Sequence, residues 1–216
     1  MIPDADPLPI AIVGCGPGAP EYLTAAGQDA IRSAAVLVGS AQLLALHAAA
    51  GQARVVFGSD VAETLAQIER HRRRHAVAVL VSGDPGLCSL ARPVLRRFGR
   101  ASCRVIPGVS AVQAAFAAVG VDWLDAAIVD AHHALPEADI EALSDRQKIA
   151  VLGGHREALA WIVRLGARLG DAYTPVVCED LTLPGERVRI LAPGSSVQGP
   201  LASRTIVLFL GKELLT

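Results

Sequence analysis

Short apolar runs alternate with helix-like segments along the first half of the chain. The runs are rich in Val, Ile, Leu and Ala, and they cover residues 9–13, 35–38, 55–57, 76–81 and 104–106. Continuous apolar runs of this length are typical of strands that are buried on both faces of a parallel sheet. The segments between them have helical spacing, and Thr24 and Asp60 stand where an N-cap is expected. This alternation predicts an α/β domain built on a parallel sheet.

The pattern restarts after the segment Val121–Ala126, which predicts a joint between two domains. The elements expected beyond it are strands at 127–131, 148–152, 175–179, 187–191 and 205–210, and a helix at 156–170. Pro184-Gly185 and Pro193-Gly194 are turn signals that suit antiparallel strands, so a mixed sheet is predicted here. The chain is therefore expected to divide into an N-terminal α/β domain, residues 1–120, and a C-terminal α/β domain, residues 121–216.

The composition excludes several broad classes of protein. The 216 residues are 52% hydrophobic and 19% charged, which excludes intrinsic disorder. The net charge of −1 argues against an electrostatically driven nucleic-acid binder. No apolar run approaches the ~20 residues that span a bilayer, and the N-terminal segment with Asp4 and Asp6 does not resemble a targeting sequence. We therefore expect a cytoplasmic protein that binds neither nucleic acid nor membrane.

Arginine and cysteine add two further expectations. Lys148 and Lys212 are the only lysines among the 20 basic residues, so 18 are arginines. Both genomic base composition and a substrate with many carboxylates explain this bias. The positive run His71–His75 closes an expected helix, and we interpret it as a solvated face. The four cysteines lack zinc-ligand spacing, so we expect buried reduced thiols and no metal site.

Three glycine-bearing loops follow expected strands, at 14–18, 82–86 and 106–110. Open α/β sheets bind ligands at the carboxyl ends of their strands, which makes these loops candidates for a site. In the second loop, Asp84 either accepts hydrogen bonds from a ligand or only stabilises its own turn. In the third, Ser110 either binds a ligand or only caps the helix that follows.

A dinucleotide site in the first loop is not expected. Pro17 and Pro20 break the helix that would have to receive a pyrophosphate. No acidic residue follows Val38, where such a site needs one for the ribose.

In order and spacing, the loops resemble the tetrapyrrole methylases, S-adenosylmethionine-dependent C-methyltransferases of the cobalamin and sirohaem pathways. The matching segments are GCGPGAPEYLT from Gly14, LVSGDPG from Leu80 and VIPGVSAVQAAFAAVG from Val105. In the second half, DWLDAAIVDAHH from Asp122 and VVCEDLTLPGERV from Val176 resemble the subfamily that methylates C5 of precorrin or cobalt-precorrin. The likeness covers nearly the whole chain from residue 9.

This resemblance implies a two-domain tetrapyrrole-methylase-like fold, with a parallel-sheet N-domain, a mixed-sheet C-domain and S-adenosyl-L-methionine in the cleft between them. It also implies a homodimer and a corrin precursor as substrate. The cofactor contacts that it carries over by motif are Pro17, Gly83, Asp84, Leu87, Ser110, Ala111 and Gly153. The sequence departs from the family at Ala19, which replaces an acidic residue, at His132-His133, and at Gly153-Gly154.

The resemblance predicts an enzyme that methylates C5 of a corrin-ring precursor in cobalamin biosynthesis. A proton must leave during that reaction, and its candidate acceptors are Asp130, His132, His133 and Glu179, none of which the sequence singles out. Arginine suits a substrate rich in carboxylates, and the candidates near expected loops are Arg92, Arg156, Arg187 and Arg189.

Other functions remain open at this point. One is methylation at another ring position, or of another acceptor such as a modified histidine on a protein. Another is a non-catalytic cofactor-binding paralogue, which the departures at Ala19, His133 and Gly153-Gly154 suggest. The chain ends at Thr216 without a fused decarboxylating C15-methylating domain, so we expect a separate protein to supply that activity where it is needed.

Overall fold

The structure is a computed structural model that describes residues 7–132, 135–136, 139–155, 157–199 and 201–215. The chain divides into two compact units, of which the first ends at Ser110 and the second begins at Ala111. The sequence predicts the joint later, at Val121–Ala126. The difference is helix α5 (Ala111–Ala118), which packs near strand β10 (Thr205–Gly211) and so belongs with the second unit.

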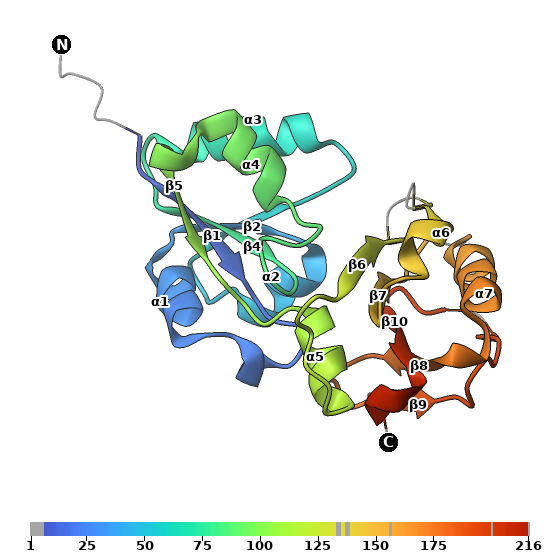
Figure 1. The fold of residues 1–216 in the computed structure, drawn as a ribbon. Coiled ribbons are helices and arrows are strands. Elements are labelled where there is room, and N and C mark those ends of the chain that lie inside the picture. Colours follow the sequence, from blue (N-terminus) through green and yellow to red (C-terminus); the bar gives the residue numbers. More distant parts are fainter. Residues whose placement is uncertain (1–6, 133–134, 137–138, 156, 200, 216) are drawn as a thin grey trace, which may run out of the picture. The chain divides into compact units, whose positions relative to one another are not determined.

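The first unit is built on a parallel sheet, as the alternating pattern predicts (Figure 1). Its strands, in the spatial order β3-β2-β4-β1-β5, are Ala53–Val56, Val36–Gly39, Val77–Val81, Ile10–Gly14 and Cys103–Ile106. Every residue of β4 is buried, because the strand lies in the middle of the sheet with helices on both faces. The sheet therefore presents the carboxyl ends of β4, β1 and β5 side by side.

Helices cover both faces of this sheet (Figure 1). They are α1 (Ala25–Ser33), α2 (Ala41–His47), α3 (Val61–Arg72) and α4 (Ala91–Phe98), with 3₁₀ turns at Pro20–Tyr22 and Arg100–Ser102. Both N-caps predicted from the sequence are confirmed. The Thr24 hydroxyl accepts a hydrogen bond from the Gly27 N–H at 3.1 Å, and an Asp60 oxygen accepts from the Glu63 N–H at 3.0 Å.

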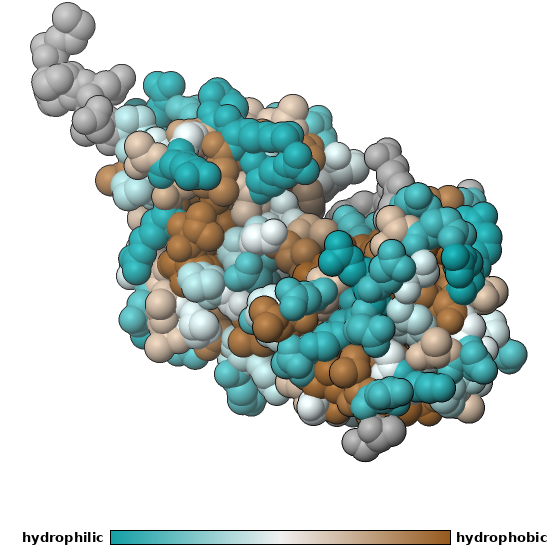
Figure 2. All heavy atoms as spheres, in the orientation of Figure 1, coloured by the Kyte–Doolittle hydropathy of each residue, from teal (hydrophilic) through white to brown (hydrophobic). Residues whose placement is uncertain are grey.

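The arginine-rich ends of α3 and α4 are only partly a solvated face. Hydrophilic side chains lie over both helices in Figure 2, in keeping with the exposed Arg73 and Arg97. Arg72, however, is 6% exposed, and its guanidinium lies 5.3 Å from the centre of the Phe98 ring. The interpretation of His71–His75 as solvated is therefore wrong for Arg72, because the helix turns this side chain onto an aromatic face.

The second unit is built on a mixed sheet, as the Pro-Gly turns predict. Its strands, in the order β6-β7-β10-β8-β9, are Ala127–Asp130, Lys148–Leu152, Thr205–Gly211, Tyr173–Glu179 and Arg187–Ile190. Strands β6 and β7 are parallel, and the other neighbouring pairs are antiparallel. The helices are α5, α6 (Ile140–Leu143) and α7 (Ala158–Leu169), with 3₁₀ turns at Gly170–Ala172 and Lys212–Leu215. The sequence does not predict α6, which is too short to show a helical period.

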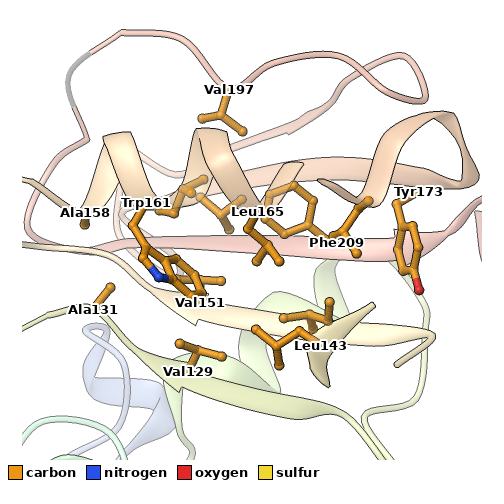
Figure 3. Close-up of a cluster of buried hydrophobic side chains, with 14 of the residues drawn as sticks. Val129, Ala131, Leu143, Val151, Ala158, Trp161, Leu165, Tyr173, Val197 and Phe209 are labelled. Carbon is orange, nitrogen blue, oxygen red and sulfur yellow. The ribbon is translucent and has the colours of Figure 1, made fainter. Parts of the chain in front are cut away.

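Helix α7 packs its apolar side on one face of this sheet (Figure 3). Trp161 and Leu165 of the helix lie against Val151 and Phe209 of the strands, and all four are buried. The apolar positions of α7 recur at helical spacing, so one side of the helix is removed from water along its length. Among the described residues, no helix has the length and apolar character needed to cross a membrane.

The cysteines are free thiols in differing surroundings. Cys15 and Cys178 are buried, and burial raises the pKa of each thiol to about 12. Cys103 is half-buried and Cys88 is exposed, so the expectation of buried thiols is wrong for Cys88. In the described part of the chain, no three His, Cys, Asp or Glu side chains are grouped to hold a metal ion.

Candidate functional site

The three glycine loops meet at the carboxyl edge of the first sheet. Strand β1 lies between β4 and β5, so the loops that follow these strands are neighbours. Gly16 and Gly83 form an antiparallel bridge, in which the Gly83 N–H donates to the Gly16 carbonyl at 2.8 Å and the Gly16 N–H donates back at 3.2 Å. The first and second loops are thus joined through their backbones.

The third loop approaches the other two so closely that side chains are excluded. A Cβ on Gly14 would lie 2.6 Å from the Gly108 nitrogen, and a Cβ on Gly108 would lie 2.5 Å from the Gly83 oxygen. No side chain fits these separations. The glycines at 14 and 108 are therefore explained by the packing of loop against loop, whatever ligand lies above them.

Asp84 links the second loop to the third. One carboxylate oxygen accepts a hydrogen bond from the Gly86 N–H at 2.7 Å, and the other accepts from the Gly108 N–H at 3.1 Å. A carboxylate accepts about four hydrogen bonds, so both oxygens retain acceptor capacity. Asp84 is half-buried, which leaves it accessible. The sequence predicts either a turn-stabilising or a ligand-binding aspartate, and this geometry is compatible with both.

The other predicted cofactor contacts of the first unit lie on the same loops. Pro17 follows the Gly16–Gly83 bridge, and Leu87 donates its N–H to the Asp84 carbonyl at 3.2 Å. Ser110 is 8% exposed and ends the third loop. The structure therefore brings Pro17, Gly83, Asp84, Leu87 and Ser110 to one edge, while their role in cofactor binding stays a prediction.

One feature of this edge has no signal in the sequence. Cys88, next to Leu87, has a φ of 48°, in the left-handed region that non-glycine residues rarely adopt. Backbone strain of this kind gathers at ligand sites, where the surrounding structure must hold it in place. The sequence could not reveal it because cysteine has no preference for this conformation.

Several candidates also share one edge of the second sheet. Strands β9 and β10 run antiparallel to β8, so they begin where β6, β7 and β8 end. This topology gathers the predicted residues Asp130, His132, Gly153, Glu179 and Arg187 at a single edge. Ala111 begins α5, Arg92 lies exposed in α4, and His133 and Arg156 fall outside the described residues.

His132 is held in one tautomer by the loop after β7. Its Nδ1 lies 2.8 Å from the Gly153 carbonyl oxygen, which can only accept, so Nδ1 carries a proton and, in the neutral ring, Nε2 has the lone pair. The backbone N–H of His132 donates to Asp130 Oδ1 at 2.8 Å. A Cβ on Gly154, whose φ is 139°, would overlap the imidazole ring. Gly154 thus makes room for the His132 ring, and Gly153 supplies the carbonyl that the ring contacts.

Glu179 is a buried carboxylate between two arginines. Its side chain is 7% exposed, and its Oε2 lies 3.5 Å from Arg187 Nη2 and 3.4 Å from Arg189 Nη2. Across the sheet Glu179 is in register with Thr205, whose buried hydroxyl lacks a hydrogen-bond partner in the described structure. The Thr205 carbonyl in turn accepts a hydrogen bond from the Gly153 N–H at 2.8 Å, and the Gly153 carbonyl contacts His132, so both backbone groups of Gly153 are bonded.

Comparison with known proteins gives a consistent result along the chain. The model of the family described as Tetrapyrrole (Corrin/Porphyrin) Methylases matches residues 9–193. A cobalt-precorrin-7 C(5)-methyltransferase of Salmonella typhimurium is 32% identical over 200 residues, which are 92% of this chain and 98% of that protein. A probable cobalt-precorrin-7 C(5)-methyltransferase of Methanocaldococcus jannaschii is 23% identical, over 94% of this chain and 99% of that protein.

Solved structures share the fold. A precorrin-6Y methylase of cobalamin biosynthesis from Archaeoglobus fulgidus is 28% identical with a TM-score of 0.71, covering 94% of this chain and 98% of its own. A uroporphyrin-III C-methyltransferase from Thermus thermophilus, complexed with S-adenyl homocysteine, is 23% identical with a TM-score of 0.72, covering 94% and 97%. The predicted α/β fold, with its parallel and mixed sheets, is confirmed.

Proposed function

Because the chain belongs to the tetrapyrrole methylase family, we propose that it transfers a methyl group from S-adenosyl-L-methionine to C5 of a corrin-ring precursor in cobalamin biosynthesis. The observation that carries this proposal is the identity to a C5-methyltransferase over nearly the full length of both chains. Glu179, which ends β8, and Asp180, which begins the loop after it, lie within the segment that resembles the C5 subfamily.

The first-unit edge fits a ligand that carries hydroxyl and amino donors. Asp84 is fixed by two backbone N–H groups and retains acceptor capacity for further donors. Pro17, Gly83, Leu87 and Ser110 lie on the same set of loops, and the resemblance assigns Ala111 and Gly153 of the second unit to the cofactor as well. When bound, S-adenosyl-L-methionine supplies the electrophilic methyl group on a sulfonium. The protein's part is to align the nucleophilic ring carbon with that methyl group and to exclude water.

Methylation of a ring carbon that bears hydrogen must release a proton. A bond forms between the ring carbon and the methyl carbon, the bond from methyl to sulfur breaks, and the hydrogen on the ring carbon leaves without its electrons. Of the three described candidates, Glu179 is engaged by two arginines, and the Asp130 carboxylate, which accepts from the His132 backbone, retains acceptor capacity. The Gly153 carbonyl orients the His132 ring through Nδ1, so in the neutral imidazole the lone pair is on Nε2. We assign His132 as the proton acceptor.

The second candidate function is a sister reaction at another ring position or acceptor. A non-catalytic paralogue is the third, and Gly154 gives it little support because the absence of a side chain there accommodates His132. We also propose a cytoplasmic homodimer. Light scattering of the purified chain tests the dimer.

Incubation with methyl-¹³C-labelled cofactor and a panel of precorrins and cobalt-precorrins tests the function. We expect label at C5 of one acceptor, located by NMR. Label at another ring carbon would favour the sister reaction. Tight binding of S-adenosylhomocysteine without label in any acceptor would favour the non-catalytic paralogue.

A further inference from the structure

We propose that Arg187 and Arg189 form a clamp for carboxylate side chains of the substrate, and that the buried Glu179 positions both arginines. The inference deepens the proposed function and rests on it for the identity of the substrate, since corrin precursors carry many carboxylates. It selects these two arginines from the 18 in the chain.

The strand register places the three side chains on one face of the second sheet. Arg187 pairs with Glu179 and Arg189 pairs with Val177, and residues two apart on a strand project from the same face. Val188 and Ile190 alternate with them and project from the opposite face. The hairpin from β8 to β9 thus fixes two guanidinium groups beside one buried carboxylate.

The charges within this cluster do not balance. Both Nη2 atoms lie within 3.5 Å of the same Glu179 oxygen, so two positive groups share one negative group. The arginine side chains are 67% and 48% exposed, whereas the Glu179 side chain is 7% exposed. Each guanidinium has several N–H donors and meets Glu179 through one nitrogen, so most of its donors remain directed away from Glu179.

The contribution of this cluster of one carboxylate and two arginines to folding stability does not explain its presence. Exposed ion pairs contribute little, and burying a carboxylate costs desolvation energy that long contacts repay only in part. Arg168 and Glu141, by contrast, form a paired fork through three hydrogen bonds between exposed side chains. An excess guanidinium charge on a rigid strand is suited to bind an external carboxylate, which arginine grips through paired N–H donors.

The hairpin that presents the arginines is itself constrained. Asp180 and Thr182, in the loop after β8, have φ values of 49° and 69°. Asp180 accepts from Arg204 at 2.9 Å, which anchors the loop to the residue before β10. Strained backbone held by side-chain contacts is typical of positions where a site must be fixed before its ligand arrives.

Direct binding tests the clamp without relying on catalysis. The probe is uroporphyrin, a stable tetrapyrrole polycarboxylate, titrated by absorption against wild type, R187Q, R189Q and the double variant. We expect Kd to rise about tenfold in each single variant and roughly a hundredfold in the double variant, with a shallower salt dependence. R168Q is the matched control, because Arg168 is also 48% exposed and forms an ion pair in the same unit. It should leave Kd unchanged, and thermal melts check that each variant folds.

Glu179 is tested as a positioning residue by E179Q. This change removes the negative charge beside the two arginines. If Glu179 acted only through its charge, uroporphyrin would bind more tightly to E179Q; if Glu179 positions the arginines, uroporphyrin would bind more weakly. We expect weaker binding, with the affinity for S-adenosylhomocysteine unchanged in calorimetry. Equal or tighter binding would overturn the positioning role.

The outcomes separate the clamp from the proposed function. Unchanged uroporphyrin affinity in the double variant, or no binding by wild type, would overturn the clamp. Loss of binding in the double variant, together with no methyl transfer by wild type to any corrin precursor, would sustain the clamp and reject the proposed reaction.

Discussion

Replacing Asp84 with alanine removes the side chain that joins two loops of the first unit. The carboxylate accepts from the Gly86 N–H at 2.7 Å and from the Gly108 N–H at 3.1 Å. Hydrogen bonds to a charged group contribute about 1.5–3 kcal/mol each, and the half-buried position of Asp84 favours the lower end of that range. We therefore expect Asp84→Ala to lower the free energy of unfolding by about 3 kcal/mol.

The same change should remove the acceptor capacity that we assign to the cofactor. We expect the affinity for S-adenosylhomocysteine, measured by calorimetry, to fall at least a hundredfold, which corresponds to about 2.7 kcal/mol. Denaturant titration of the unliganded protein gives the stability, so the two effects are measured separately. The calorimetry is done at a temperature where the Asp84→Ala protein is folded, so that weak binding cannot be caused by unfolding of the variant.

Asp60→Ala is the matched control for both measurements. Asp60 also accepts a backbone N–H through its carboxylate, at 3.0 Å, but it caps α3. Loss of this cap should cost about 1 kcal/mol of stability and leave cofactor affinity unchanged. Wild-type affinity in a folded Asp84→Ala protein would refute the assignment of Asp84 to the cofactor, and unchanged stability would refute its role in joining the loops.

Three further changes test other parts of the structure. Gly108→Ala should destabilise the protein by roughly 3 kcal/mol or prevent folding, because its Cβ would lie 2.5 Å from the Gly83 oxygen, whereas Gly58→Ala, with nothing within 4 Å, should be tolerated in denaturant titration. His132→Gln should lower kcat about 10²–10⁴-fold and leave S-adenosylhomocysteine affinity unchanged; an unaltered kcat would reject His132 as proton acceptor. At pH 8 the exposed Cys88 should react with a thiol reagent in the native protein, while Cys15, whose pKa burial raises to about 12, stays protonated and reacts only after unfolding; mass spectrometry of the labelled chain distinguishes them.

Most strands of both sheets follow from the sequence because they are local apolar runs, whereas β9 follows from the Pro-Gly turn signals that flank it. Lys148–Leu152 is predicted to the residue, and the strands ending at Val81 and Glu179 end where the sequence predicts. The joint between the units is not local in this way. Helix α5 has the same Ala-rich pattern whichever sheet it packs on, and its packing near β10, far along the chain, decides the matter.

The sequence predicts which loops form the candidate sites, but it does not predict the hydrogen bonds between those loops. The sequence places Asp84 at a strand end, yet its bond to Gly108 depends on β1 lying between β4 and β5. The tautomer of His132 likewise depends on β6 and β7 being neighbours, which brings the Gly153 carbonyl to its ring. Strand order is a property of the whole sheet, and no spacing within a motif encodes it.

The glycines of the motifs illustrate why a motif and a site are different things. Gly14 and Gly108 are required because backbones meet there, so their presence reports the assembly of the loops and would persist in a protein that had lost its ligand. Asp84 also joins loops, through Gly86 and Gly108, but both of its oxygens retain acceptor capacity. Arg187 and Arg189 share one contact with Glu179, which leaves charge that the described fold does not use. Groups whose bonding capacity exceeds what folding consumes are therefore the better guide to what the protein binds.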